Sequence, residues 1–129
     1  MKKKLPKISG REKDVMSILW RSENALTASS IAEEGGVSIN TVQAALRSLV
    51  KKEYIEVAQI VYSGTVLSRS YQAIVSAEEY AADQLQAMRM DSLNFSTMSF
   101  VDHLVKNDES NKILDELENS IRRKKKQED

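Results

Sequence analysis

Residues 38–55 read SINTVQAALRSLVKKEYI, and as a helix this stretch separates its side chains into an apolar and a polar face. The apolar face holds Val42, Ala45, Leu46, Leu49 and Val50, and the polar face holds Asn40, Gln43, Arg47 and Lys51. Ser38 is a favourable N-cap residue, so we expect a helix from Ser38 to about Glu53. The apolar face predicts packing against a core, whereas the polar face carries hydrogen-bonding groups without a partner nearby in the sequence.

Two shorter helices are predicted before this stretch. Ser9 and Glu12 form a capping box, which satisfies two otherwise unpaired backbone groups at the start of a helix. A second helix begins in TASSIAEE with Thr27 as its N-cap, and Gly35–Gly36 ends it because glycine readily adopts the left-handed conformation. Two helices joined by a short turn that contains glycine are typical of a helix-turn-helix.

A hairpin is predicted after the third helix. Residues 54–75 are rich in β-branched residues and tyrosine, and a Ser-Gly pair at 63–64 interrupts them. This pattern predicts two strands with the tip near residues 63–65. Three helices followed by such a hairpin make a winged helix, so we expect a winged-helix DNA-binding domain over residues 1–75.

The remainder of the chain is predicted to be helical, beginning with a second capping box formed by Ser76 and Glu79. Its apolar residues recur at helical spacing: Tyr80, Leu85, Met88, Phe100, Val101, Leu104, Val105, Ile113, Leu114, Leu117 and Ile121. Helices this short and one-sided do not bury their apolar faces alone. We therefore expect a helical dimerisation domain over residues 76–129 and a homodimer. The predicted fold is mainly α with a small β-hairpin wing.

Charge and composition narrow the function. Residues 1–75 hold 11 Lys and Arg against 7 Asp and Glu, whereas residues 76–129 hold 8 against 12. A basic half indicates nucleic acid as a partner. The absence of cysteine excludes disulfides, thiolate metal sites and thiol catalysis. No apolar run approaches the roughly 20 residues that span a bilayer, and no secretion signal follows the N-terminal lysines, so we expect a cytoplasmic protein.

The polar face of the helix over residues 38–53 has the chemistry to bind DNA. A helix fits the major groove, where Asn or Gln can bond adenine at two atoms, and Ala or a Thr methyl can contact the thymine methyl. Arg47 is positioned for guanine or a phosphate, and the start of the helix can hold a phosphate. The candidate DNA-binding residues are Ser38, Ile39, Asn40, Thr41, Gln43, Ala44, Arg47, Lys51, Ser68 and Arg69, with Lys52, Ser63 and Thr65 as further candidates.

Two other interpretations stay open at this point. Winged helices also serve as protein–protein interaction modules without DNA binding, and Ile39, Val66 and Leu67 are apolar residues that would favour this role. Arg69 could simply pair with a neighbouring acid. An enzyme has little support, because His103 is the only histidine and the acidic residues are spread along helix faces. We therefore expect no catalytic residue, no metal and no cofactor.

The sequence resembles the penicillinase-repressor family of the BlaI/MecI and CopY type. The resemblance rests on ISGREKDVMSILW at 8–20, LTASSIAE at 26–33, INTVQAALRSLVKKEYI at 39–55 and SYQAIVSAEEY at 70–80. It implies a dimeric transcriptional repressor with an N-terminal winged helix and a C-terminal dimerisation domain. The implied operators are inverted repeats of the TACA/TGTA type, and the implied role is control of β-lactam resistance or a related stress response.

The resemblance also bears on how repression ends. In the BlaI/MecI branch a membrane sensor pathway leads to proteolytic cleavage of the dimerisation domain, which implies a protease partner. The cleaved Asn–Phe bond of that branch falls at His103–Leu104 here, and an Asn94–Phe95 pair stands in the preceding loop. The copper-responsive branch instead binds metal through cysteines, which this chain lacks. The predicted wing is longer than is typical of the family, and Val37 stands where the family often has Trp.

Overall fold

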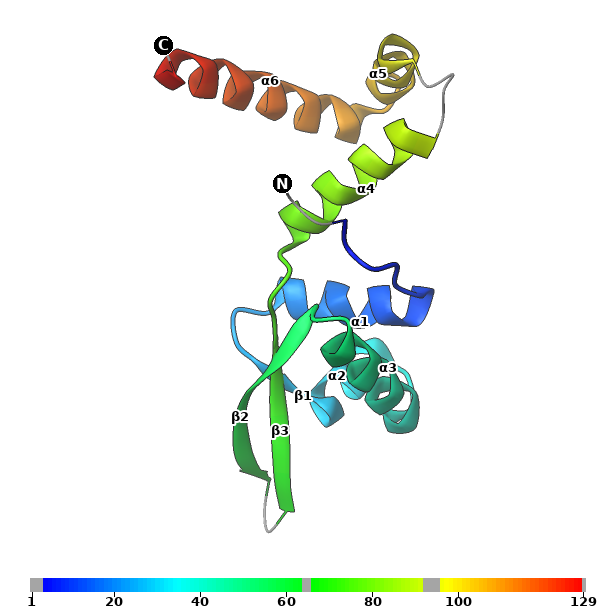
Figure 1. The fold of residues 1–129 in the computed structure, drawn as a ribbon, viewed down its shortest axis with the longest axis vertical. Helices are drawn as coiled ribbons and strands as arrows, with labels where there is room; N and C mark the ends of the chain where they lie inside the picture. The colour runs from blue at the N-terminus through cyan, green and yellow to red at the C-terminus, as the bar shows by residue number, and fades with distance from the viewer. Residues whose placement is uncertain (1–3, 64–65, 92–95, 129) are drawn as a thin grey trace. The chain divides into compact units, whose positions relative to one another are not determined.

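The computed structural model describes residues 4–63, 66–91 and 96–128 and has six helices and three strands in these ranges (Figure 1). In chain order they are α1 (Gly10–Arg21), β1 (Leu26–Thr27), α2 (Ala28–Gly35), α3 (Ile39–Lys51), β2 (Ile55–Ser63), β3 (Val66–Ala73), α4 (Ala77–Asp91), α5 (Thr97–Val105) and α6 (Asp108–Glu128). The predicted class, mainly α with a small hairpin, is confirmed.

The helix ends follow the capping residues. Ser9 and Glu12 form the predicted capping box, with the Ser9 N–H donating to Glu12 Oε1 at 2.8 Å. Thr27 and Ser38 are the N-caps of α2 and α3, as predicted. Gly36 ends α2 in the left-handed conformation, with φ at 64°. These contacts are local in sequence, which explains why the sequence predicts them.

The core lies where α1, α2 and α3 pack against one another and against the base of the hairpin. Its fully buried members include Met16 of α1, Ile31 of α2, and Leu46 and Leu49 of α3. One residue of the predicted apolar face is an exception. Val50 is 39% exposed, so the buried stripe of α3 consists of Val42, Ala45, Leu46 and Leu49.

The helix predicted from Ser38 to about Glu53 ends earlier than expected. α3 stops at Lys51, and Glu53 then adopts a left-handed backbone with φ at 63°. The backbone N–H groups of Lys52 and Tyr54 bond to Ser48 and Leu49, which closes the helix. This turn brings the fully buried Tyr54 into the core and directs the chain into β2.

The sheet has three antiparallel strands in the order β1-β3-β2. The hairpin β2–β3 is the predicted wing, and it extends beyond the helices (Figure 1). Strand β1 was not predicted, because a two-residue strand carries no periodicity. Its residues Leu26 and Thr27 pair with Tyr71 and Ser70 of β3, so the start of α2 lies beside the wing.

The chain forms two compact units, Met1–Gln86 and Ala87–Asp129. The first contains the winged helix and the beginning of α4, whereas the predicted domain boundary lies at 75/76. In the second unit α5 packs against α6. The assignment of residues 76–129 to dimerisation stays a prediction. None of the described helices is long and apolar enough to cross a membrane.

Candidate DNA-binding surface

The start of α3 presents most of the predicted contact residues to solvent. Ile39, Asn40, Gln43 and Ala44 are exposed, as are Arg47 and Lys51 further along the helix. The Ser38 hydroxyl accepts from the Thr41 backbone N–H at 3.2 Å and lies 2.9 Å from the Thr41 hydroxyl. Thr41 is half-buried, and both its backbone N–H and its hydroxyl have Ser38 as a partner. The exposed row is held by the buried stripe on the opposite side of the helix.

A groove separates the start of α3 from the wing. Its lining comes from α2, α3 and the hairpin: Thr27, Ala28, Ser29, Ile39, Gln43, Ile60, Val66, Leu67, Ser68, Arg69 and Tyr71. It brings four of the predicted residues together, two from the helix and two from the wing. Asn40, Ala44, Arg47 and Lys51 do not line this groove and lie on the exposed side of α3.

The register of the hairpin explains which wing residues face the helix. Opposite residues of an antiparallel pair share one face, so Tyr71, Arg69 and Leu67 lie on the same face as Val57, Ile60 and Tyr62. A register shift between Val57 and Gln59 keeps Val57 and Ile60 on this common face, because it adds one residue to β2. Ile60, Leu67, Arg69 and Tyr71 of this face line the groove, and Tyr71 packs against the core; Val66 and Ser68 of the other face also reach the lining.

Sequence reasoning missed the contribution of α2. Ala28 and Ser29 enter the groove because β1 pairs with β3, and this pairing links positions more than 40 residues apart. From the sequence, residues 27–29 were predicted only as the start of a helix. Ile60 and Tyr71 were assigned to the hairpin but not to the surface. Counting the alternation of side chains along the strands, with one extra residue in β2, would have placed both on the face that lines the groove.

Lys52 has a structural role, although it was a candidate for phosphate contact. Its Nζ donates to Glu12 Oε1 at 2.9 Å and to the Lys7 carbonyl at 2.8 Å. Burial raises the pKa of Glu12, but the Ser9 backbone N–H, the Ser48 hydroxyl and the Lys52 ammonium lower it by more, to about 2. Lys52 therefore joins α3 to α1 and is not a free cation.

The two arginines of the candidate surface are not engaged in this way. Within the ranges that the structure describes, neither Arg47 nor Arg69 forms an ion pair. The alternative that Arg69 pairs with a neighbouring acid is thus not observed there.

Of the wing residues, Ser68 is half-buried and Arg69 is exposed. Thr65 and the Asn94–Phe95 pair lie outside the described residues, as does the side chain of Ser63.

The predicted dimerisation residues divide by exposure. Leu85, Met88, Val105, Ile113, Leu117 and Ile121 are exposed, whereas Phe100, Val101, Leu104 and Leu114 are half-buried. Ile113, Leu117 and Ile121 recur every four residues and are each more than half exposed, which forms a stripe along α6. Tyr80 belongs to the first unit, where its ring lies 5.4 Å from that of Trp20. His103 is exposed on α5, next to the half-buried Leu104.

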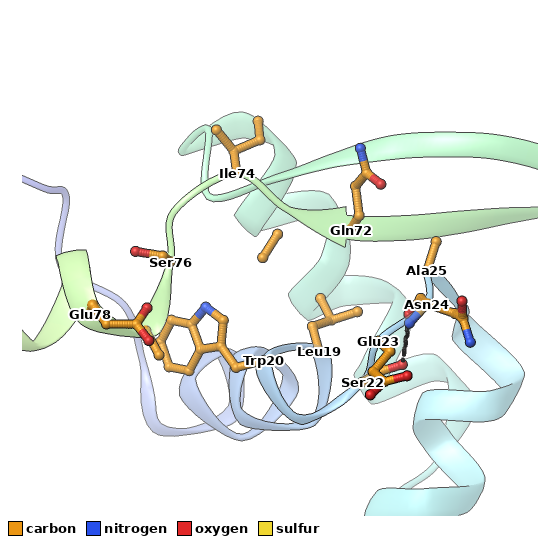
Figure 2. Close-up of a pocket in the computed structure, with 12 residues that line it drawn as sticks. Leu19, Trp20, Ser22, Glu23, Asn24, Ala25, Gln72, Ile74, Ser76 and Glu78 are labelled. Atoms are coloured by element: carbon orange, nitrogen blue, oxygen red, sulfur yellow. Dashed lines mark hydrogen bonds between the residues drawn. The ribbon is translucent and has the colours of Figure 1, made fainter.

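A second pocket lies between the end of α1 and the turn that leads into α4 (Figure 2). Its wall includes Trp20, whose indole N–H donates to the Val75 carbonyl at 2.9 Å. The Ser22 hydroxyl donates to the Asn24 carbonyl at 2.6 Å. Both groups therefore donate to backbone carbonyls. No group of three or more metal-ligating side chains occurs in the part of the chain that the structure describes.

Comparison with known proteins identifies the family. The sequence model of the penicillinase repressor family matches residues 8–123. The chain belongs to this family. Membership in the penicillinase repressor family, together with the winged helix, supports the assignment of this protein as a DNA-binding transcriptional repressor. The members of this family are transcriptional regulators and not enzymes. No curated protein matches the chain significantly.

Solved structures of transcription regulators are similar to this penicillinase repressor family member to different degrees. A mutant of MepR from a multidrug resistant S. aureus clinical isolate is 15% identical, with a TM-score of 0.50 over 92% of this chain and 80% of MepR. Streptococcus pneumoniae FabT in complex with DNA is 16% identical, with a TM-score of 0.45 over 95% and 78% of the two chains. PerR from Streptococcus pyogenes is 19% identical, with a TM-score of 0.42 over 53% of this chain, which spans about half (48%) of PerR. At 15% identity, the likeness to MepR shows the fold alone.

Proposed function

We propose that the protein is a homodimeric transcriptional repressor that binds an inverted-repeat operator of the TACA/TGTA type. The observation that carries the proposal is the exposed polar row of α3. Asn40, Gln43 and Arg47 project from a helix whose other face is fully buried, and a groove joins this helix to the wing. A rigid helix with a polar outer row is what entry into the major groove requires.

The residue types of the row suit an A/T-containing half-site. The amides of Asn40 and Gln43 can each donate to and accept from an adenine edge, and the Ala44 methyl can contact a thymine methyl. Arg47, one turn further on, can make two bonds to guanine or one to a phosphate. Lys51 and the backbone at the Ser38 end of α3 can hold phosphates, which fixes the register of the helix.

The wing supplies a second contact to the same duplex. Arg69 is exposed beside the groove, and Ser68 lies next to it. Both can bind phosphates on the side of the groove opposite α3. The apolar lining, Ile39, Ile60 and Leu67, can pack against sugar and methyl groups. Contacts from helix and wing together would orient each half of the dimer on DNA.

The partner in the dimer is a second copy of the chain, bound through α5 and α6. The stripe of Ile113, Leu117 and Ile121 is apolar and exposed. Residues 108–118 hold five acidic residues and one basic residue, whereas residues 122–128 hold five basic and one acidic. Two α6 helices packed antiparallel about Leu117 would bring the acidic part of each against the basic part of the other.

The control of repression is proposed from the family alone. Regulation of β-lactam resistance or a related stress response, and derepression by a protease, are the family's expectations. The site of cleavage would fall on α5 at His103–Leu104 or on the Asn94–Phe95 pair. Incubation of the dimer with an extract from β-lactam-treated cells, followed by mass spectrometry, would identify any cleaved bond.

Fluorescence anisotropy tests the proposed function. A labelled duplex with a TACA/TGTA palindrome is titrated at several salt concentrations, beside a scrambled duplex of the same composition. We expect tighter binding to the palindrome and a steep loss of affinity with salt, because each phosphate contact releases about one counterion. Equal, weak binding to both duplexes would refute this operator, and selection from a random duplex pool would then find another or none.

A protein–protein interaction module is the second candidate. The exposed apolar residues of the wing favour it, because Ile60, Tyr62, Val66 and Leu67 are each more than half exposed. It predicts no selection of any duplex from the random pool. It also predicts that Leu67→Asp would not change the protein's affinity for DNA and would abolish its binding to a protein partner.

A further inference from the structure

The segment before α1 binds at three points to the residues around it. It lies beside the start of α4 and leads into α1 (Figure 1). The Leu5 N–H donates to Asp83 Oδ1 of α4 at 3.1 Å, and the Pro6 carbonyl accepts from the Tyr54 hydroxyl at 2.6 Å. The Lys7 carbonyl accepts from Lys52 Nζ at 2.8 Å. We call residues 5–7 the N-terminal clamp.

Two of these three bonds come from the residues that end α3, the recognition helix of the proposed function. Lys52 is the C-cap of α3, and Tyr54 is the fully buried residue two positions later. Tyr54 is also tied through its backbone, since its N–H bonds to Leu49 and its carbonyl accepts from Ile74 and Val75. The clamp is therefore bonded to the end of α3 by the fully buried Tyr54, which belongs to the core, and by the partly exposed Lys52.

The third bond comes from α4, whose base rests on the same residues. The ring of Tyr80 lies 6.3 Å from that of Tyr54 and 5.4 Å from that of Trp20. Trp20 in turn donates its indole N–H to the Val75 carbonyl, just before α4 begins. Asp83 is half-buried one turn after Tyr80. The clamp thus spans from the end of α3 to the second turn of α4.

We infer that the N-terminal clamp fixes the direction of α4 relative to α3 and so sets the half-site spacing that the dimer accepts. The inference rests on the proposed function, because spacing has meaning only for a dimer on an inverted repeat. α4 is one continuous helix that leads from the winged helix into residues 87–91 of the second unit. The direction of its base therefore contributes to the separation of the two recognition helices. Leu5, Tyr54 and Asp83 act as positioning residues and do not contact DNA.

A series of operators that differ only in spacing tests the inference. Each added base pair moves one half-site by about 3.4 Å and rotates it by about 35°. The wild type should prefer one spacing by tenfold or more over neighbours that are one base pair longer or shorter. The double variant Tyr54→Phe/Asp83→Ala removes two clamp bonds and keeps the ring of residue 54. We expect its preference to fall to less than threefold, with binding to a single half-site unchanged.

Matched variants separate the clamp from general damage. Asp83→Asn keeps an oxygen acceptor for the Leu5 N–H and should retain the wild-type preference. Glu78→Gln changes an exposed carboxylate on the first turn of α4 and should also retain it. A double variant that keeps the wild-type spacing profile would overturn the inference. A wild type that does not distinguish the palindrome from the scrambled duplex would overturn the proposed function and the inference together.

A distance measurement provides a readout that does not depend on DNA. The chain has no cysteine, so Lys51→Cys carries one spin label at the end of each α3. Pulsed electron resonance on the free dimer should give a narrow distribution of label–label distances. The same label in the clamp double variant should give a broader or shifted distribution. Identical distributions would contradict a role of the clamp in placing the recognition helices.

Discussion

At the scale of single residues, Glu12 joins three segments of the winged helix. Its side chain accepts from the Ser9 N–H at the start of α1 and from Lys52 at the end of α3, and Lys52 also holds the Lys7 carbonyl. The carboxylate is almost completely buried. A buried acid is stable in charged form only when donors compensate its charge, and the Ser9 N–H and the Lys52 ammonium both donate to its Oε1.

The depressed pKa of Glu12 predicts acid sensitivity. The pKa falls from 4.5 to about 2 on folding, so its contribution to stability is complete above pH 4.5 and is lost as the pH falls toward 2. The contribution is on the order of 3 kcal/mol. Glu12→Gln should lower the free energy of unfolding at pH 7 and remove this pH dependence, as followed by urea denaturation from pH 7 to 3. Glu34→Gln, an exposed site on α2, should behave like the wild type. Parallel pH profiles of Glu12→Gln and wild type would refute the assignment.

Arg47 gives the direct test of base contact. Its side chain is exposed and forms no ion pair among the described residues, so Arg47→Ala should leave thermal stability unchanged. If it contacts a guanine, the change should weaken operator binding by about 1–3 kcal/mol and relax the preference at one base pair. A phosphate contact would instead weaken binding to all duplexes alike. Arg21→Ala, at the end of α1, is the control. Operator affinity equal to that of the wild type would remove Arg47 from the surface.

At the scale of elements, local signals account for what the sequence predicts. The capping residues Ser9, Thr27 and Ser38 define three helix starts, because each bonds to a backbone group within three residues. Strand β1 and the partners of Lys52 depend on residues 40 or more positions away, which no periodicity reports. Of the candidate surface, the helix row was predictable from amphipathicity. The groove was not, because it requires the pairing of β1 with β3.

The turn between α2 and α3 depends on Gly36 more than on other glycines. Its φ of 64° is unfavourable for a residue with a Cβ, although a Cβ there would meet no atom within 4 Å. Gly36→Ala should therefore destabilise the fold by about 1–2 kcal/mol through the backbone alone. Gly10→Ala, in an open site on the first turn of α1, should be neutral or stabilising by up to about 1 kcal/mol. Chemical denaturation compares the two. Equal effects would show that the left-handed turn is not what matters at position 36.

At the scale of the whole molecule, the proposed repressor function divides between two compact units. The unit of residues 1–86 contains α3, the proposed recognition helix, and the wing, and the unit of residues 87–129 carries exposed apolar residues on α5 and α6. The apolar stripe of α6 has no cover within the described chain, and a second copy would provide one. In the proposed dimer, the second copy would double the number of DNA contacts on an inverted repeat.

Leu117 is at the centre of the stripe and tests the dimer. Leu117→Asp places a charge between Ile113 and Ile121, which should shift the protein to a monomer in sedimentation experiments. The winged helix should keep its stability, and affinity for the palindrome should fall toward that for a single half-site. Asn119→Asp, on the opposite side of α6, adds the same charge and should remain dimeric. A dimeric Leu117→Asp would exclude this stripe as the interface.

The orientation of the two α6 helices can be tested through their charges. In an antiparallel pair centred on Leu117, Glu109 of one copy lies near Lys124 of the other, and two-fold symmetry repeats the contact. Glu109→Lys and Lys124→Glu each replace two attractive contacts by repulsive ones, so each should weaken the dimer by about 1–2 kcal/mol. The double variant Glu109→Lys/Lys124→Glu restores opposite charges at both contacts. Its dimer dissociation constant should return close to that of the wild type at low salt. Effects that simply add in the double variant would mean that these residues do not meet across the interface, and the antiparallel arrangement would be wrong.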